Sequence, residues 1–120
     1  MAIYKIPLYP TEHELTLVIE KTLSMTDETV KEMLDSELEL EPLSPTTKAF
    51  SMNCVSYGER FFIIGITTKS LAAEILHEAI HVTWYLSEIC GFNYKQDPEL
   101  QCYLSEYLFN KIMAYKKPRR

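Results

Sequence analysis

The 120-residue sequence contains no apolar run approaching the roughly 20 residues that a membrane-spanning helix needs. Its longest apolar stretch, FFIIGI at 61–66, has the length of a buried strand. The N-terminal residues MAIYKIPLYP lack the charged start and long apolar centre of a secretory signal, so we expect a cytoplasmic protein that neither spans nor binds a membrane. There is no internal repeat, low-complexity tract or linker, and the length fits a single domain over residues 1–120.

Cysteine is scarce and is not arranged for cross-linking. The three cysteines, Cys54, Cys90 and Cys102, are widely spaced, and none forms a CxxC pair. This spacing argues against a disulfide framework and against a thiolate zinc knuckle. We therefore expect three free thiols in a reducing compartment.

Basic charge is also scarce outside the C-terminus. The net charge is −5, but the tail KKPRR at 116–120 holds four of the 12 basic residues. The preceding chain thus carries eight basic against 17 acidic residues, a net charge of −9. A body this acidic argues against nucleic acid as the main partner, and we expect the tail to be solvated.

The apolar pattern predicts an α+β domain. Aromatic and β-branched residues indicate strands at 2–9 and 14–19, and Pro7 favours an edge position for the first. A second pair, 49–57 and 60–66, is predicted to form a hairpin.

Three helices are predicted, one from about Thr26, one over 70–90 and one over 97–115. Ser70 or a neighbouring threonine offers an N-cap for the second helix, Gly91 ends it, and Pro98 follows the capping residue of the third. We expect the last two helices to pack antiparallel on the sheet, with six apolar side chains inside: Ile75, Ile80, Trp84, Leu100, Leu104 and Leu108.

The sequence HEAIH at 77–81 lies within the second of these helices. Residues four apart share one face of a helix, so His77 and His81 point the same way and can offer two imidazole nitrogens to one zinc ion. Glu78 lies beside the first histidine, where the HExxH metalloproteases place a proton-accepting carboxylate. With three histidines and 14 glutamates, shuffling would produce this pattern in roughly one chain in a hundred. However, a purely structural apolar helix is not expected to carry two of the three histidines, because polar side chains are costly to bury without partners.

A catalytic zinc needs a third protein ligand and leaves one position for water. Among the downstream acids, Glu88 lies two turns beyond His81 and is too far along the same helix. Glu99, one turn into the last helix, fits best, because a helical hairpin would bring it back over the histidines. Cys54 and Glu106 stay open as alternatives.

The motif HEAIH followed by PELQCYLSEYL resembles the small gluzincin-type metallopeptidase-like proteins that phages and mobile elements encode. In that group HExxH is followed by a helix of the form E-x-x-x-Y-L-x-x-Y, which Glu99, Tyr103 and Tyr107 match here. The resemblance implies a zincin-like fold with His77, His81 and Glu99 as zinc ligands and Glu78 as the catalytic carboxylate. A phage-encoded protein of this kind would act in the host cytoplasm.

These residues predict a zinc-dependent hydrolase that cleaves a peptide bond in a peptide or protein substrate. Glu78 would serve as the base, and the Tyr103 hydroxyl is the candidate donor to the developing oxyanion, unless Tyr103 only packs the helix. Strand 60–66 could hold an extended peptide along its edge. The alternative function is a zinc-binding regulatory or interaction module on the same scaffold, without hydrolysis.

Overall fold

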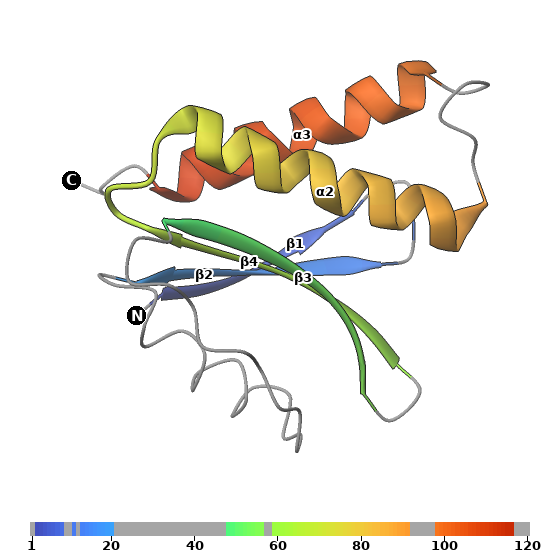
Figure 1. Ribbon diagram of the computed structural model, residues 1–120, viewed down its shortest axis with the longest axis horizontal. Helices are drawn as coiled ribbons and strands as arrows, with labels where there is room; N and C mark the ends of the chain where they lie inside the picture. Colours follow the sequence, from blue (N-terminus) through green and yellow to red (C-terminus); the bar gives the residue numbers. More distant parts are fainter. Residues whose placement is uncertain are drawn as a thin grey trace.

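A computed structural model of the protein describes residues 2–8, 11, 13–20, 48–56, 59–91 and 98–116. The elements of secondary structure are β1 (Ala2–Pro7), β2 (Glu14–Glu20), β3 (Ala49–Ser56), β4 (Glu59–Thr67), α2 (Ala72–Cys90) and α3 (Pro98–Lys116). The helix predicted from about Thr26 and the C-terminal tail beyond Lys116 lie outside the described residues. The predicted α+β class is confirmed: the described residues form one four-stranded sheet with two helices on one of its faces (Figure 1).

The sheet is mixed, and its strand order is β1-β2-β4-β3. The central strands β2 and β4 pair in parallel, with Leu15 opposite Phe62, while β1 and β3 each pair antiparallel with their neighbour. Pro7 lies in an edge strand, as predicted, where its missing N–H costs no ladder hydrogen bond. The hairpin of β3 and β4 is also confirmed.

The prediction that strand 60–66 offers a free edge is wrong. This strand is β4, which pairs with β2 on one side and with β3 on the other. Its backbone N–H and C=O groups are therefore used on both sides, and no peptide can be added there. The edge strands are β1 and β3.

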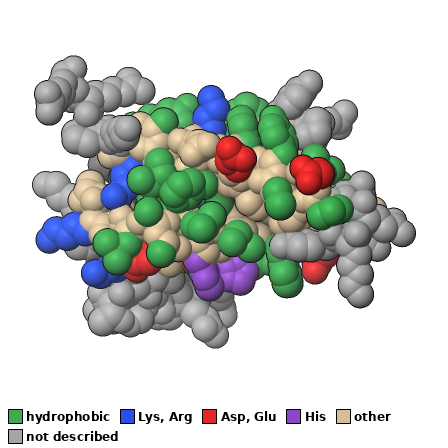
Figure 2. Space-filling model, turned by 90° about the horizontal axis from the view of Figure 1, so that it is seen from above, with side chains coloured by type: hydrophobic (Ala, Val, Ile, Leu, Met, Phe, Trp, Pro, Cys, Tyr) green, Lys and Arg blue, Asp and Glu red, His purple; other side chains and the backbone are tan. Residues whose placement is uncertain are grey.

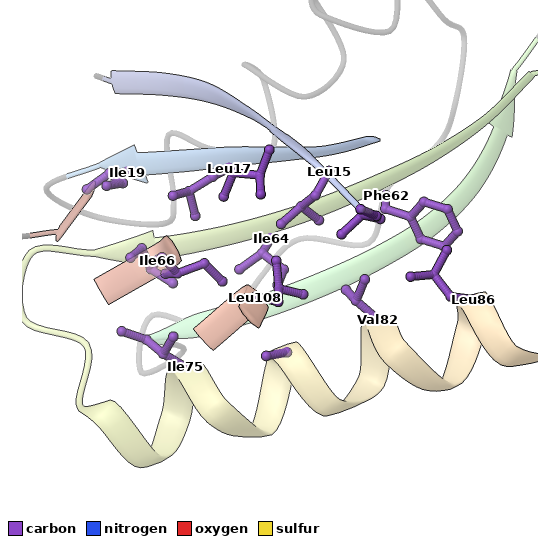
Figure 3. Packing of buried hydrophobic residues seen from close by; sticks show 14 residues of the cluster. Leu15, Leu17, Ile19, Phe62, Ile64, Ile66, Ile75, Val82, Leu86 and Leu108 are labelled. Carbon is purple, nitrogen blue, oxygen red and sulfur yellow. The ribbon is translucent and has the colours of Figure 1, made fainter. Parts of the chain in front are cut away.

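The main core lies between the sheet and the two helices (Figure 3). Alternate residues of each strand point to the same face, so every second residue of β2 and β4 meets the helical layer. The side chains that meet there come from β1, β2, β4, α2 and α3 and include Leu15, Leu17, Ile19, Phe62, Ile64, Ile66, Ile75, Val82, Leu86 and Leu108. Burying each such side chain fully stabilises the fold by about 1.5–3 kcal/mol.

The other face of the central strands is buried too. Val18 and Ile63 are fully enclosed, and Phe50 on β3 packs beside them. Phe50 lies opposite Gly65 in the antiparallel ladder. A Cβ added at Gly65 would overlap the Phe50 ring, so the glycine lets the ring lie across β4. Burial on both faces explains why FFIIGI is a continuous apolar run rather than an alternating one.

The two ends of α2 are fixed differently from each other. Its first turn is closed by the Leu71 N–H, which donates to the Glu74 carboxylate at 2.8 Å. Gly91 ends it in the left-handed conformation (φ 77°), and its N–H donates to the Ser87 carbonyl at 3.1 Å. The expectation that Ser70 caps the helix is wrong, because its hydroxyl accepts from the Thr67 N–H at 2.9 Å and donates to the Lys48 carbonyl. Ser70 thus ties the end of β4 to the start of β3.

The helices α2 and α3 lie side by side and run antiparallel, as predicted (Figure 1). The Ser105 hydroxyl on α3 donates to the Thr83 hydroxyl on α2 at 3.3 Å, which fixes how the two helices align. Neither of these described helices is long and apolar enough to cross a bilayer.

The predicted interior of the helical layer is only partly right. Ile75, Leu104 and Leu108 are buried, and Leu100 is half-buried. Ile80 and Trp84, by contrast, are 37% and 51% exposed. They lie five and nine residues after Ile75, which places them about 140° and 180° around the helix from it. Both therefore face outward.

Candidate metal centre

His77 and His81 lie one turn apart on the outward face of α2, and both side chains are exposed. Their Nε2 atoms are 3.1 Å apart, and their ring planes meet at 74°. The helix produces this convergence by itself, because residues i and i+4 stack one above the other on the same face.

The spacing of the two nitrogens fits a shared metal ion. Zinc binds histidine nitrogen at about 2.0–2.1 Å, which makes the edge of a tetrahedral site about 3.3 Å long. The observed 3.1 Å is within a few tenths of an ångström of that edge. When no ion is bound, the same distance lets one Nε2–H donate to the other ring, so the pair is satisfied in both states.

Glu78 and Tyr85 lie on the flank of α2 between the histidines and the core. Glu78 is half-buried and lies about 100° around the helix from His77, so it does not join the two histidine nitrogens. Tyr85 lies four residues after His81, and its ring is nearly parallel to the His81 ring, with centroids 6.3 Å apart and planes at 19°. Tyr85 was not among the residues predicted for the site, although the spacing of four from His81 would have indicated it.

Glu99 does not meet the histidines in this arrangement. The contact between Ser105 and Thr83 sets the alignment of the antiparallel helices. Glu99 precedes Ser105 by six residues on α3, so it lies about 9 Å from the Ser105–Thr83 contact, toward the C-terminal end of α2. His81 precedes Thr83 by two residues, so it lies about 3 Å from the same contact, toward the N-terminal end of α2. The offset along the axis is therefore about 12 Å. Among the described residues, no three His, Cys, Asp or Glu side chains are grouped to hold a metal ion.

Tyr103 lies on the far flank of α3. Its ring stacks on Tyr107, with centroids 6.1 Å apart, and the Tyr107 hydroxyl donates to the Pro7 carbonyl of β1 at 2.8 Å. This flank faces the edge strand β1, while Ser105 faces α2. The Tyr103 hydroxyl is thus not directed at the histidine pair, and the helix-packing interpretation describes its surroundings better. Desolvation, followed by the nearby Tyr103 and Tyr115, raises the pKa of Tyr107.

The remaining candidates are dispersed. Cys90 and Cys102 are exposed free thiols, and desolvation raises the pKa of Cys90. Glu106 is exposed on α3. The His13 ring is edge-on to Phe62, with centroids 5.7 Å apart. Cys54 is in β3, but its side chain lies outside the described set.

Comparison of the chain with protein-family models, with curated proteins and with solved structures gave no match.

Proposed function

We propose that this protein binds zinc through His77 and His81, and that zinc binding is the function its geometry supports best. The observation that carries the proposal is the 3.1 Å separation of the two Nε2 atoms on one exposed helical face. Two imidazole donors suit zinc, and the related ions of copper and nickel are the competing occupants. Tyr85 would limit rotation of the His81 ring and so help to keep its nitrogen aimed at the ion.

The chemistry that we propose for the bound ion is peptide-bond hydrolysis of the zincin type. Zinc held there would act as a Lewis acid and lower the pKa of coordinated water to about 7. Glu78 is the neighbouring carboxylate, and it is not needed as a ligand. Its Oε atoms would accept a proton from the attacking water and pass it to the amine nitrogen of the leaving peptide.

A second candidate is a zinc-binding module without hydrolysis. It is favoured by the exposure of both histidines and by the lack of a third protein donor beside them among residues 2–8, 11, 13–20, 48–56, 59–91 and 98–116. A catalytic zinc ordinarily has three protein ligands, so two donors alone support binding more directly than they support catalysis.

One experiment separates these functions. Zinc binding is measured by calorimetry and metal analysis, and hydrolysis against a peptide library, for the wild type, Glu78→Gln and Glu88→Gln. Glu88 is an exposed glutamate on the same helix, so its substitution controls for loss of charge on α2. The hydrolase proposal expects all three proteins to bind zinc at saturation, and expects cleavage to fall by a factor on the order of 10² or more only in Glu78→Gln.

If all three proteins bind zinc but none cleaves a peptide, the hydrolase proposal is rejected and the zinc-binding module is supported. Zinc binding that survives in a His77→Ala, His81→Ala double variant would overturn the metal centre itself.

A further inference from the structure

The outward face of α2 carries apolar side chains next to the histidine pair. Leu76 and Ile80 each precede a histidine directly, and Trp84 continues the same spacing of four residues. These three side chains are 40%, 37% and 51% exposed, although they are large and apolar. Seen from above the helical layer, the purple histidines lie at its margin beside a band of green apolar side chains (Figure 2). Exposed apolar surface around polar donors is typical of an interaction site.

The pair fills only half of a zinc site. Structural zinc sites in proteins are almost always closed by four ligands in a tetrahedron, and His77 and His81 supply two nitrogens. A two-fold axis through the ion would bring the same two nitrogens from a second copy of the chain, because a symmetric dimer presents identical patches to each other. Every ligand would then come from the same short stretch of α2.

Resting on the zinc binding proposed above, we infer that zinc joins two copies of this protein through His77 and His81 of each. Opposite edges of a tetrahedron are perpendicular, and the two histidines of one copy lie one turn apart along α2. The two α2 helices therefore cross steeply at the ion. Leu76 and Ile80 lie next to the crossing point, so they are covered by the second copy and help to exclude water from the ion.

Charge supports a second copy as the occupant. Four neutral imidazoles leave the two positive charges of zinc uncompensated. Each copy brings one Glu78 on the flank beside its histidines, so two copies place two carboxylates near one divalent ion. Glu88 lies about 10 Å beyond His81 along the helix, so in a steep crossing it stays roughly that far from the ion and contributes less to its charge balance.

The zinc-bridged pair would be closed to water and substrate, because all four positions on the ion are filled. Only a single copy with bound zinc could then hydrolyse a substrate, whereas the zinc-bridged dimer could not. The same two histidines would bind zinc in both forms.

The test uses the full chain, titrated with zinc and followed by light scattering during size exclusion and by metal analysis. We expect the mass to double from 14.0 kDa as zinc reaches one ion per two chains. His77→Ala and His81→Ala should each abolish the zinc-dependent doubling, whereas His13→Ala, which removes the histidine outside the pair, should leave it unchanged. Ile80→Lys should weaken the zinc-dependent dimer at least tenfold while both histidines remain.

The alternative results are distinct. One ion per chain with an unchanged mass would overturn the dimer and leave the zinc site standing. Doubling that occurs without zinc, or that persists in the histidine variants, would also overturn it. No bound zinc at all would overturn the dimer together with the proposed function.

Discussion

Replacing Gln101 with methionine should make the protein more stable. Gln101 lies in the first turns of α3 and is only 3% exposed, and neither its amide nitrogen nor its amide oxygen has a hydrogen-bond partner among the described residues. Burying a polar group without a hydrogen-bond partner costs about 1–3 kcal/mol of desolvation free energy, which no interaction in the folded state offsets. Methionine is also unbranched and has nearly the same helix propensity as glutamine, so the substitution removes the polar atoms and little else.

We therefore expect Gln101→Met to raise the free energy of unfolding by about 1–3 kcal/mol. Urea denaturation followed by circular dichroism measures this change as a higher midpoint with an unchanged slope. Asn110→Met, on the exposed side of the same helix, is the control for helix propensity and added apolar surface. If Gln101→Met is neutral or destabilising while the control behaves as an ordinary surface substitution, the amide has partners in solution and the reasoning is refuted.

Further substitutions test other parts of the fold. Gly65→Ala should destabilise the sheet by about 1–3 kcal/mol, since its Cβ overlaps the Phe50 ring, and adding Phe50→Leu should recover part of the loss in chemical denaturation. Tyr107→Phe removes the hydrogen bond to Pro7, a loss of at most about 1 kcal/mol at neutral pH. The raised pKa of Tyr107 means that the folded state keeps this proton longer than the unfolded state. The stability that this group contributes is complete below the unfolded pKa of about 10 and is lost as the pH rises from there through the folded pKa. The melting temperature of Tyr107→Phe should therefore fall less steeply with rising pH in this alkaline range than that of the wild type. Gly91→Ala should lower the melting temperature through its positive φ, at a cost of about 1 kcal/mol, and Gly91→Asn should cost less.

The sequence predicted those elements whose signals are local. The two N-terminal strands, the hairpin of β3 and β4, the glycine that ends α2 and the proline that begins α3 were all placed within a few residues. Each depends on neighbours in the chain: alternation within a strand, a tight turn, or the backbone preference of glycine or proline.

The sequence could not predict which of two apolar stripes on α2 faces the core. Ile75, Val82 and Leu86 form one stripe, and Ile80 and Trp84 belong to another with regular spacing of its own. Helical periodicity gives the angle between the stripes, but only packing against the sheet selects one of them.

The position of Glu99 relative to the histidines could not be predicted for a similar reason. The short stretch of sequence between α2 and α3 predicts an antiparallel pair, but it does not predict which flank of α3 meets α2. Because Ser105 takes that position, Glu99 and Tyr103 lie elsewhere on the helix. The pairing of β2 with β4 was hidden likewise, since 47 residues separate Leu15 from Phe62 and no local pattern shows that they are neighbours.

The histidine pair, unlike the rest of the candidate site, is encoded within a single helical turn. Both nitrogens are positioned by the backbone of α2 over five consecutive residues, so their separation does not depend on how α3 docks or on which strands adjoin. A short helical peptide with the same five residues would therefore present the same two donors. The sheet and α3 can then diverge in sequence without disturbing the pair, provided that the local turn of helix persists. Whatever completes the coordination shell is, by contrast, a property of the assembled molecule and is free to change independently.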